Sequence, residues 1–258
     1  MSVLDDKVAL VTGAKGGLGS FVTEAFLQAG AAVVGVSRSI QASDFPNPQF
    51  TAIPAELSGG EAARQLAAAV VERFGKIDIL VHLVGGFAGG QPVHETGEAT
   101  LDRMLDMNLK SAFYVARAVL PHMRNQGGGR ILAIGSRAAV EPSPGAAAYA
   151  TSKAALVSLI RTIAAENTDR QISANVILPG TMDTPANRKS DPGADYSKWV
   201  QPGDVANLLV ALAADSASQV NGAVLPIYSH GGDESDAGES DRTAWKELVS
   251  KLLQQSGE

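Results

Sequence analysis

The sequence contains no cysteine among its 258 residues. This absence excludes a disulfide framework, a thiolate nucleophile and a zinc site with cysteine ligands. Histidine is also scarce, and the four residues at positions 82, 94, 122 and 230 lack the spacing that places two metal ligands on one helix. We therefore expect no metal centre and interpret these histidines as packed or solvated side chains.

Long apolar runs and clusters of basic residues are missing as well. No segment reaches the ~18 consecutive apolar residues that indicate a membrane-spanning helix. Two acidic residues, Asp5 and Asp6, precede the first apolar run, which is unlike a signal peptide. A net charge of −6 without a basic cluster argues against nucleic acid or an anionic membrane as the partner. We expect a cytoplasmic protein that acts on a small molecule.

Short apolar runs typical of buried strands alternate along the chain with segments of helical periodicity. The strand-like runs are Val8–Val11, Ala32–Val36, Ile77–Leu83, Arg130–Ile134, Ala174–Leu178 and Ala223–Ile227. The helical segments include Glu61–Phe74, Thr100–Met123 and Ala150–Glu166. This alternation predicts an α/β fold with a doubly wound parallel sheet and helices on both faces.

No linker rich in proline or serine divides the core, so we predict one domain over residues 1–232. The segment Thr181–Val200 interrupts the alternation with prolines and charges, and we predict a long substrate loop there. An acidic, glycine-rich tail follows over 233–258, in which Thr243–Gln254 has a weakly amphipathic pattern. The tail is interpreted as a mobile appendage or an oligomer contact, with a solvated helix as the alternative.

A glycine-rich segment, Thr12–Gly19, connects the first strand-like run to a helical pattern. Glycines at such a turn allow the backbone to approach a pyrophosphate at the positive N-terminus of the helix. The segment therefore predicts a dinucleotide site, and a tight turn without a ligand is the alternative.

A second candidate site contains Tyr149, Lys153 and Ser136. Residues four apart share one face of a helix, so the Lys153 ammonium is expected to favour the phenolate and lower the pKa of Tyr149. A phenol with a lowered pKa suits proton transfer at a carbonyl or alcohol oxygen. The Tyr-Lys spacing also occurs by chance in many helices, and its order relative to the glycine turn and Ser136 is what makes it informative.

Five motifs, taken in order, resemble those of the short-chain dehydrogenase/reductase family over roughly Lys7 to Gly232. They are TGAKGGLG at 12–19, Asn108 in Met-Asn-Leu-Lys, Ser136 in Ile-Gly-Ser, YATSK at 149–153, and Pro-Gly-Thr-Met-Asp-Thr at 179–184. The resemblance implies a Rossmann-type fold and a reversible hydride transfer between a nicotinamide and a carbonyl/alcohol pair. It also implies a homotetramer formed partly through the helices at 100–123 and 150–166.

The resemblance assigns catalytic roles to four residues. Tyr149 would pass the proton, and Ser136 would hold the substrate oxygen. Lys153 would bind the nicotinamide ribose while lowering the pKa of Tyr149. Asn108 would anchor a water molecule that links Lys153 to solvent.

The cofactor would be bound by residues from several segments of the chain. They are Gly13, Lys15, Gly17, Leu18 and Gly19 in the glycine turn, Ser37, Arg38, Glu56 and Leu57 around the adenosine, Gly85, Tyr149 and Lys153, and Pro179, Gly180, Met182 and Thr184 on the nicotinamide and phosphate side. Where the family often has an acid that binds the ribose hydroxyls, this chain has Ser37 and Arg38. A guanidinium pairs with a 2′-phosphate, so NADP is favoured over NAD, with Lys15 adding charge. The alternative is an Arg38 that stacks on the adenine of either cofactor.

The chain also departs from the family after the fourth expected strand. His82-Leu83-Val84-Gly85 replaces the usual Asn-Asn-Ala-Gly, so the side-chain bonds of that motif are expected to be lost or altered. Gly85 retains the close approach of the backbone.

Three segments around the expected pocket, 85–90, 178–189 and 195–199, are similar to those of quinonoid dihydropteridine reductase. That enzyme typically lacks the serine and prefers NADH, whereas this chain has Ser136 and Arg38. We expect Phe87 and Trp199 to enclose a flat substrate. A carbonyl/alcohol oxidoreductase is the leading hypothesis, and a pteridine reductase and a non-catalytic dinucleotide sensor are the alternatives.

Overall fold

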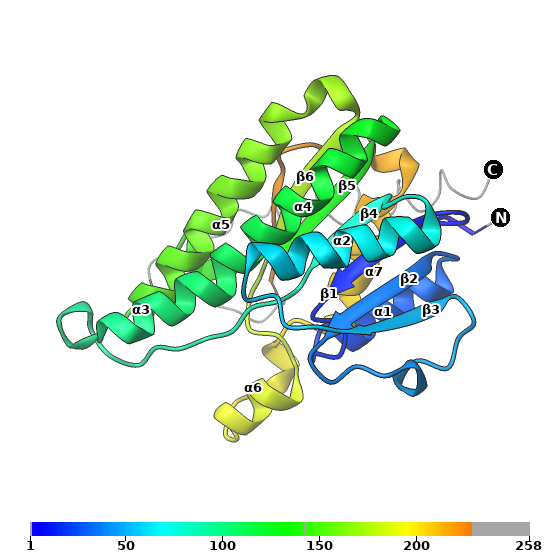
Figure 1. The fold of residues 1–258 in the computed structure, drawn as a ribbon. Helices are drawn as coiled ribbons and strands as arrows, with labels where there is room; N and C mark the ends of the chain where they lie inside the picture. The colour runs from blue at the N-terminus through cyan, green and yellow to red at the C-terminus, as the bar shows by residue number, and fades with distance from the viewer. Residues whose placement is uncertain (1, 142, 229–258) are drawn as a thin grey trace.

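A parallel sheet of seven strands forms the centre of the molecule (Figure 1). The computed structural model describes residues 2–141 and 143–228. The strands are β1 Val8–Thr12, β2 Ala32–Ser37, β3 Phe50–Pro54, β4 Ile79–His82, β5 Gly129–Ile134, β6 Ile172–Pro179 and β7 Val224–Ile227. Their order is β3-β2-β1-β4-β5-β6-β7, and every neighbouring pair is parallel. The predicted α/β sheet is confirmed, and its order reverses between β1 and β4, where such folds bind ligands.

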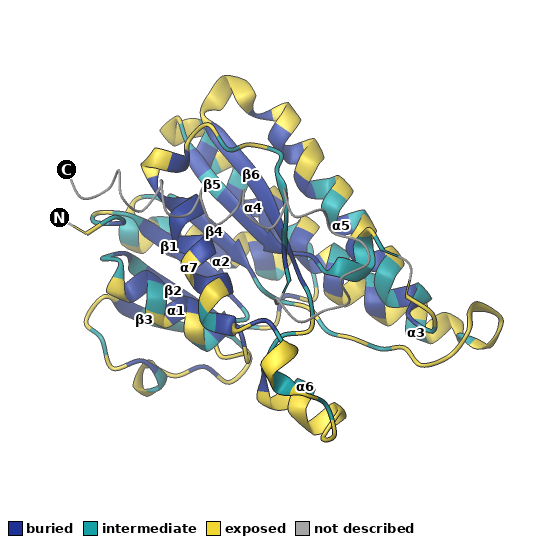
Figure 2. Ribbon diagram, turned by 180° about the vertical axis from the view of Figure 1, so that it is seen from behind, coloured by how far each residue is buried: buried dark blue, intermediate teal, exposed yellow. Residues whose placement is uncertain are grey.

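Helices cover both faces of the sheet, and each face has its own apolar core. Helices α1 (Gly19–Gln28) and α7 (Pro202–Ala213) pack on one face. Helices α2 (Gly60–Phe74), α4 (Ser111–Gln126) and α5 (Ala147–Glu166) pack on the other. The inner sides of α1, α2, α4 and α5 are buried and their outer sides exposed (Figure 2) because one side of each carries the apolar stripe, whereas the second half of α7 is buried throughout. The shorter helices α3 (Glu98–Leu105) and α6 (Pro185–Ser190) follow β4 and β6.

Strand β3 is the one strand that the sequence did not predict. It lies at the edge of the sheet, and its burial falls from Phe50 towards an exposed Pro54. An edge strand with a proline lacks the continuous apolar run of a central strand, so periodicity does not reveal it. The six predicted strands are present, with ends shifted by one or two residues.

The predicted helix at 100–123 is interrupted by a π-helical turn, η3 (Asp106–Lys110), between α3 and α4. Such turns occur mostly at functional sites, and this one contains Asn108. The predicted loop 181–200 contains α6, which the sequence analysis missed. Thr184 caps this helix and Pro185 is its first residue, a recognisable start signal.

The helix proposed at 243–254, with the rest of the tail, lies outside the described residues. None of the helices in the described parts of the chain combines the length and the hydropathy of a bilayer crossing. The division into a domain at 1–232 and a tail stays a prediction.

Candidate active site

The glycine turn lies between the carboxyl end of β1 and the N-terminus of α1, as predicted. Gly13 has a φ of +76°, and its N–H donates to the Val36 carbonyl at 2.8 Å. A Cβ atom at Gly19 would lie 2.0 Å from the Gly13 oxygen, so no larger residue fits there. The turn is therefore held tightly against the sheet, and no side chain caps the N-terminus of α1.

The segment 179–184 lies opposite this turn. A Cβ atom at Gly17 would meet the Thr184 side chain at 3.1 Å, so these two predicted cofactor residues are neighbours. Thr184 Oγ1 accepts the Asn187 N–H at 3.3 Å, and the Met182 carbonyl accepts from Asn187 Nδ2 at 2.8 Å. Pro179 ends β6, and the Gly180 N–H bonds to β7. The structure thus brings together two segments that the sequence placed at the phosphate and nicotinamide sides.

Ser136 and Tyr149 lie close enough for their side chains to interact. Ser136 follows β5, and its Oγ accepts the Ala138 N–H at 3.2 Å, which leaves the hydroxyl proton available for the phenol. Burial raises the pKa of Tyr149, and the neighbouring Ser136 hydroxyl opposes that change. The expectation that Lys153 lowers this pKa is not met, because burial dominates.

Lys153 lies on α5 one turn after Tyr149, and only 5% of it is exposed. Its Nζ donates to the Ile134 carbonyl at 2.8 Å, and burial lowers the pKa of Lys153 to about 8. A Cβ atom at Gly85 would lie 3.2 Å from Nζ, which explains the close approach expected of this glycine. The ammonium is therefore positioned by the end of β5 and by the backbone after β4.

Asn108 is fully buried in the π-helical turn. Its Oδ1 accepts the Gly86 N–H at 2.9 Å, and its Nδ2 donates to the Gly86 carbonyl at 3.0 Å and to Ser152 Oγ at 2.9 Å. The side chain thus binds the segment after β4 to helix α5. Its expected contact with a water molecule stays a prediction.

His82, interpreted from the sequence as a packed or solvated side chain and as a departure from the family, is buried at the end of β4. Thr12 Oγ1 lies 2.9 Å from Nδ1, and Ser111 Oγ lies 3.2 Å from Nε2. Neither partner could be read from the sequence, because both lie far away along the chain. The side-chain bonds at this position are altered rather than lost.

Lys15, Ser37 and Arg38, which were predicted to bind the adenosine, lie just after the carboxyl ends of β1 and β2. The Lys15 N–H donates to Ser37 Oγ at 3.1 Å, while its Nζ lies 2.8 Å from the Asp44 carboxylate. This pairing, which the sequence did not predict, lowers the pKa of Asp44. Arg38 is exposed and makes no ion pair with the described residues. Leu57 is buried after β3, beside an exposed Glu56.

The two predicted substrate residues have different surroundings. The Phe87 ring stands edge-on to the Tyr149 ring with centroids 5.0 Å apart, and 67% of Phe87 is exposed. Trp199 packs against Tyr196 at 4.8 Å. The structure therefore places Phe87 beside the predicted proton donor, while an enclosure of substrate by both rings stays a prediction.

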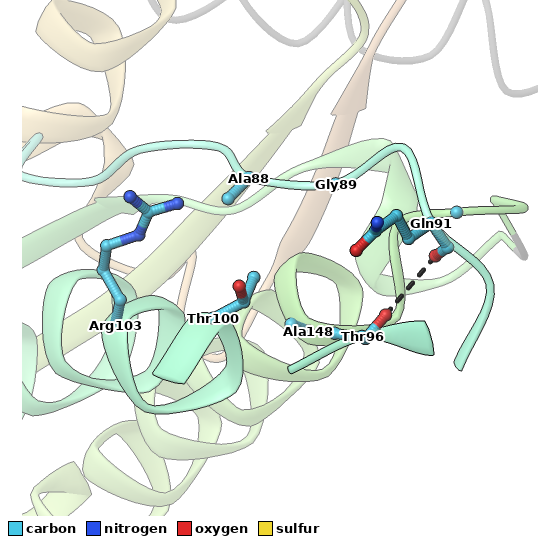
Figure 3. A pocket seen from close by; sticks show the side chains of 8 residues that line it. Ala88, Gly89, Gln91, Thr96, Thr100, Arg103 and Ala148 are labelled. Carbon is cyan, nitrogen blue, oxygen red and sulfur yellow. Dashed lines mark hydrogen bonds between the residues drawn. The ribbon is translucent and has the colours of Figure 1, made fainter. Parts of the chain in front are cut away.

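A pocket of about 410 Å³ lies beside the start of α5, between α3 and the segment after β4. Figure 3 shows Arg103 and Thr100 on α3 below Ala88 and Gly89, with the bond from Thr96 to the Gln91 carbonyl at one side. Ala148, which precedes Tyr149, contributes to its wall, as does Gly145.

In residues 2–141 and 143–228, no three histidine, aspartate or glutamate side chains gather as metal ligands.

Comparison with known proteins gives a consistent set of relatives. The family model for the short chain dehydrogenase matches residues 7–195. A 3-oxoacyl-[acyl-carrier-protein] reductase of Thermotoga maritima is 30% identical over 87% of this chain and 97% of its own. A 7alpha-hydroxysteroid dehydrogenase of Escherichia coli is 31% identical over 90% of this chain and 96% of its own. The aldohexose dehydrogenase of Thermoplasma acidophilum superposes with a TM-score of 0.79 at 26% identity, covering 88% of this chain and 94% of its own.

Proposed function

The chain belongs to the short-chain dehydrogenase family of oxidoreductases, and from this premise we propose that it transfers a hydride between NADP and a carbonyl or alcohol substrate. The observation that carries this proposal is the Ser136 hydroxyl beside the Tyr149 phenol, with the Lys153 ammonium one helical turn away. These groups provide a proton donor, a hydroxyl partner for an oxygen and a positive charge in one place.

The residues at the carboxyl ends of β1 and β6 suit a dinucleotide. The tight turn at Gly13 and Gly19 presents backbone N–H groups and the N-terminus of α1, which favour a pyrophosphate. Thr184 and the Met182 backbone lie opposite, where the nicotinamide side would be held, with Leu18, Gly17 and Gly180 beside them. When bound, the nicotinamide supplies or accepts the hydride.

The residues of this chain would manage the proton and the charge. In the direction of reduction, the Tyr149 hydroxyl donates its proton to the substrate oxygen, and the Ser136 hydroxyl donates a hydrogen bond to the same atom. Burial raises the pKa of Tyr149, so the phenol holds its proton at neutral pH until a substrate oxygen takes it. The Lys153 ammonium would bind the ribose of the cofactor.

The choice of NADP rests on Arg38. Its guanidinium has no ion-pair partner among the described residues, so it is free to bind a 2′-phosphate in a bidentate manner. Lys15 contributes less than the sequence suggested, because Asp44 neutralises it before any cofactor binds.

Reduction of a pteridine is the second candidate. The exposed ring of Phe87, edge-on to Tyr149, offers a stacking surface for a flat heterocycle. Such a reaction does not need a hydroxyl partner for a carbonyl oxygen, so the two functions differ in what they require of Ser136.

The test compares Ser136→Ala with the parent protein on one ketone and one quinonoid dihydropterin. If a ketone is the substrate, we expect a loss of about 2–4 kcal/mol of transition-state stabilisation. Ser143→Ala, at an exposed position after η4, is the matched control. An effect below twofold on the best substrate would favour pteridine reduction. Absence of any turnover with bound NADP would favour the dinucleotide sensor.

The catalytic domain is proposed to span residues 1–232, with 181–200 as its substrate loop.

We also propose a homotetramer, since Met107 and Phe113 are exposed large apolar residues near the α3–α4 junction. Sedimentation analysis of the parent and of Phe113→Asp tests this assembly.

A further inference from the structure

The His82 ring lies between two hydroxyl groups that determine which of its nitrogens carries a proton. Ser111 Oγ donates to the Met107 carbonyl at 2.7 Å, so its proton is already committed and it can only accept from His82 Nε2. The ring therefore carries its proton on Nε2. Its bare Nδ1 then accepts the proton of Thr12 Oγ1 at 2.9 Å.

The surroundings keep this ring neutral. His82 is 3% exposed, and the charged group that acts on it is the Lys153 ammonium. Burial, with a smaller contribution from Lys153, lowers the pKa of His82 to about 3. A second proton would have to enter a buried site beside a positive charge, so the ring does not gain one at neutral pH.

The bonds of His82 connect separate parts of the site. Thr12 and His82 are paired in register at the carboxyl ends of β1 and β4. Through Ser111 the ring reaches the Met107 carbonyl inside the π-helical turn. The next residue is Asn108, which clamps both polar groups of the Gly86 backbone.

The same chain of donors continues to α5. Asn108 Nδ2 donates to Ser152 Oγ at 2.9 Å, and the Ser152 hydroxyl donates to the Tyr149 carbonyl at 2.7 Å. Thr12 Oγ1 donates to His82, and the Ser111 and Ser152 hydroxyls each have one donor and one acceptor partner, so the directions agree from Thr12 to Ser111 and from Asn108 to Tyr149. The π-helical turn is the link between these two runs.

We propose that His82 is a positioning residue: a neutral imidazole, fixed as the Nε2–H tautomer, that holds the π-helical turn and so sets Asn108 against Gly86 beside Tyr149 and Lys153. The structural claim is independent of the substrate, whereas its effect on catalysis rests on the proposed function. The imidazole reaches Thr12 through Nδ1 and Ser111 through Nε2.

The first experiment measures the ring nitrogens of the full-length protein by ¹⁵N NMR, with His82 assigned by comparison with His82→Gln. We expect a protonated Nε2, a bare Nδ1 and no titration between about pH 5 and 8. An Nδ1–H tautomer, or titration within that range, overturns the proposal.

The second experiment measures hydrogen exchange of the Gly86 amide, which reports its bond to Asn108 without requiring activity. We expect exchange to quicken by roughly 10-fold or more in His82→Leu and Ser111→Ala, and by less than about 3-fold in His82→Gln, whose amide reaches the Nε2 position. His94→Asn, at an exposed histidine, is the control and should not change it. Equal protection in Ser111→Ala and the parent overturns the proposal even if His82→Leu does not fold.

The catalytic experiment compares the effect of a substitution on kcat with its effect on cofactor affinity. With a ketone substrate, Ser111→Ala should lower kcat roughly 10-fold and change the dissociation constant of NADP less than about 3-fold. His82→Gln should retain most of the parent rate. A protein inactive on ketones would contradict the proposed function but leave both NMR tests decisive for His82.

Discussion

The two ends of the proposed cofactor site are built in different ways. At the catalytic end, Lys153 and Asn108 are buried, and each is held by hydrogen bonds to the backbone of a neighbouring strand end. At the adenosine end, Arg38 is exposed and Lys15 is half-exposed in an ion pair with Asp44. Buried, hydrogen-bonded groups are expensive to remove, whereas exposed ion pairs contribute about 0–1 kcal/mol and are screened by salt. Substitutions should therefore have large effects at the first end and graded effects at the second.

The largest effect is expected from Tyr149→Phe. This change removes the proton donor and little volume, so turnover should fall by ~10²-fold or more while the cofactor still binds nearly as well. Steady-state rates at neutral pH and fluorescence titration with NADPH measure the two quantities. A variant with full activity would disprove the proposed mechanism.

Lys153→Met should separate stability from function. The folded pKa of Lys153 is about 8 and its ordinary value is 10.5, so between these pH values the unfolded chain binds more protons than the folded one. The unfolding free energy of the parent should thus rise with pH over this range. Below pH 8 the full cost of burying the charged Lys153 ammonium is present. At pH 7 we expect the variant to gain about 1–3 kcal/mol of unfolding free energy and to lose activity.

Urea denaturation at pH 7 and pH 10 tests this expectation. The exposed Lys189→Met is the control, and it should leave the pH dependence unchanged. A variant less stable than the parent at pH 7 would show that the bond to the Ile134 carbonyl outweighs the cost of burial.

Arg38→Asp tests the adenosine end. Replacing a phosphate partner with a carboxylate should shift relative binding from NADPH towards NADH by about 1–3 kcal/mol. Dissociation constants of both cofactors, measured by calorimetry, give the shift. If the parent already prefers NADH, the interpretation of Arg38 is wrong.

The smallest effect is expected from Asp44→Asn, which releases Lys15 for a 2′-phosphate. NADPH should bind roughly 3-fold more tightly, NADH should be nearly unchanged, and the gain should fade at high salt. The same change in a Lys15→Met background should have no effect. An equal gain in both backgrounds would mean that Asp44 acts on the cofactor directly.

Residues close together in the chain were the ones that sequence reasoning located well. The glycine turn follows its strand directly, and Tyr149 and Lys153 share a face of α5 because helical geometry fixes positions four apart. Central strands were found because burial on both faces requires continuous apolar runs. Edge strand β3 and helix α6 were missed because neither has such a run.

Partners far apart in the chain could not be found in this way. Lys15 and Asp44 are 29 residues apart, and so are His82 and Ser111. Helical or strand periodicity does not relate positions at such separations, and nothing local indicates that two side chains will meet. The ion pair that occupies Lys15 and the hydrogen bonds of His82 therefore became known only from the structure.

The sequence by itself determined the parallel α/β fold, the strand-to-helix glycine turn and the order of the motifs, because these depend on local periodicity and on backbone freedom at particular residues. Tertiary structure decided the ionisation of the site. The pKa of Tyr149 is raised where spacing alone predicted a decrease, and that of Lys153 is lowered, because burial acts on the charged form of each group. Burial is a property of the packed chain, so the direction of each pKa change follows from what surrounds the residue and not from the spacing of the two residues.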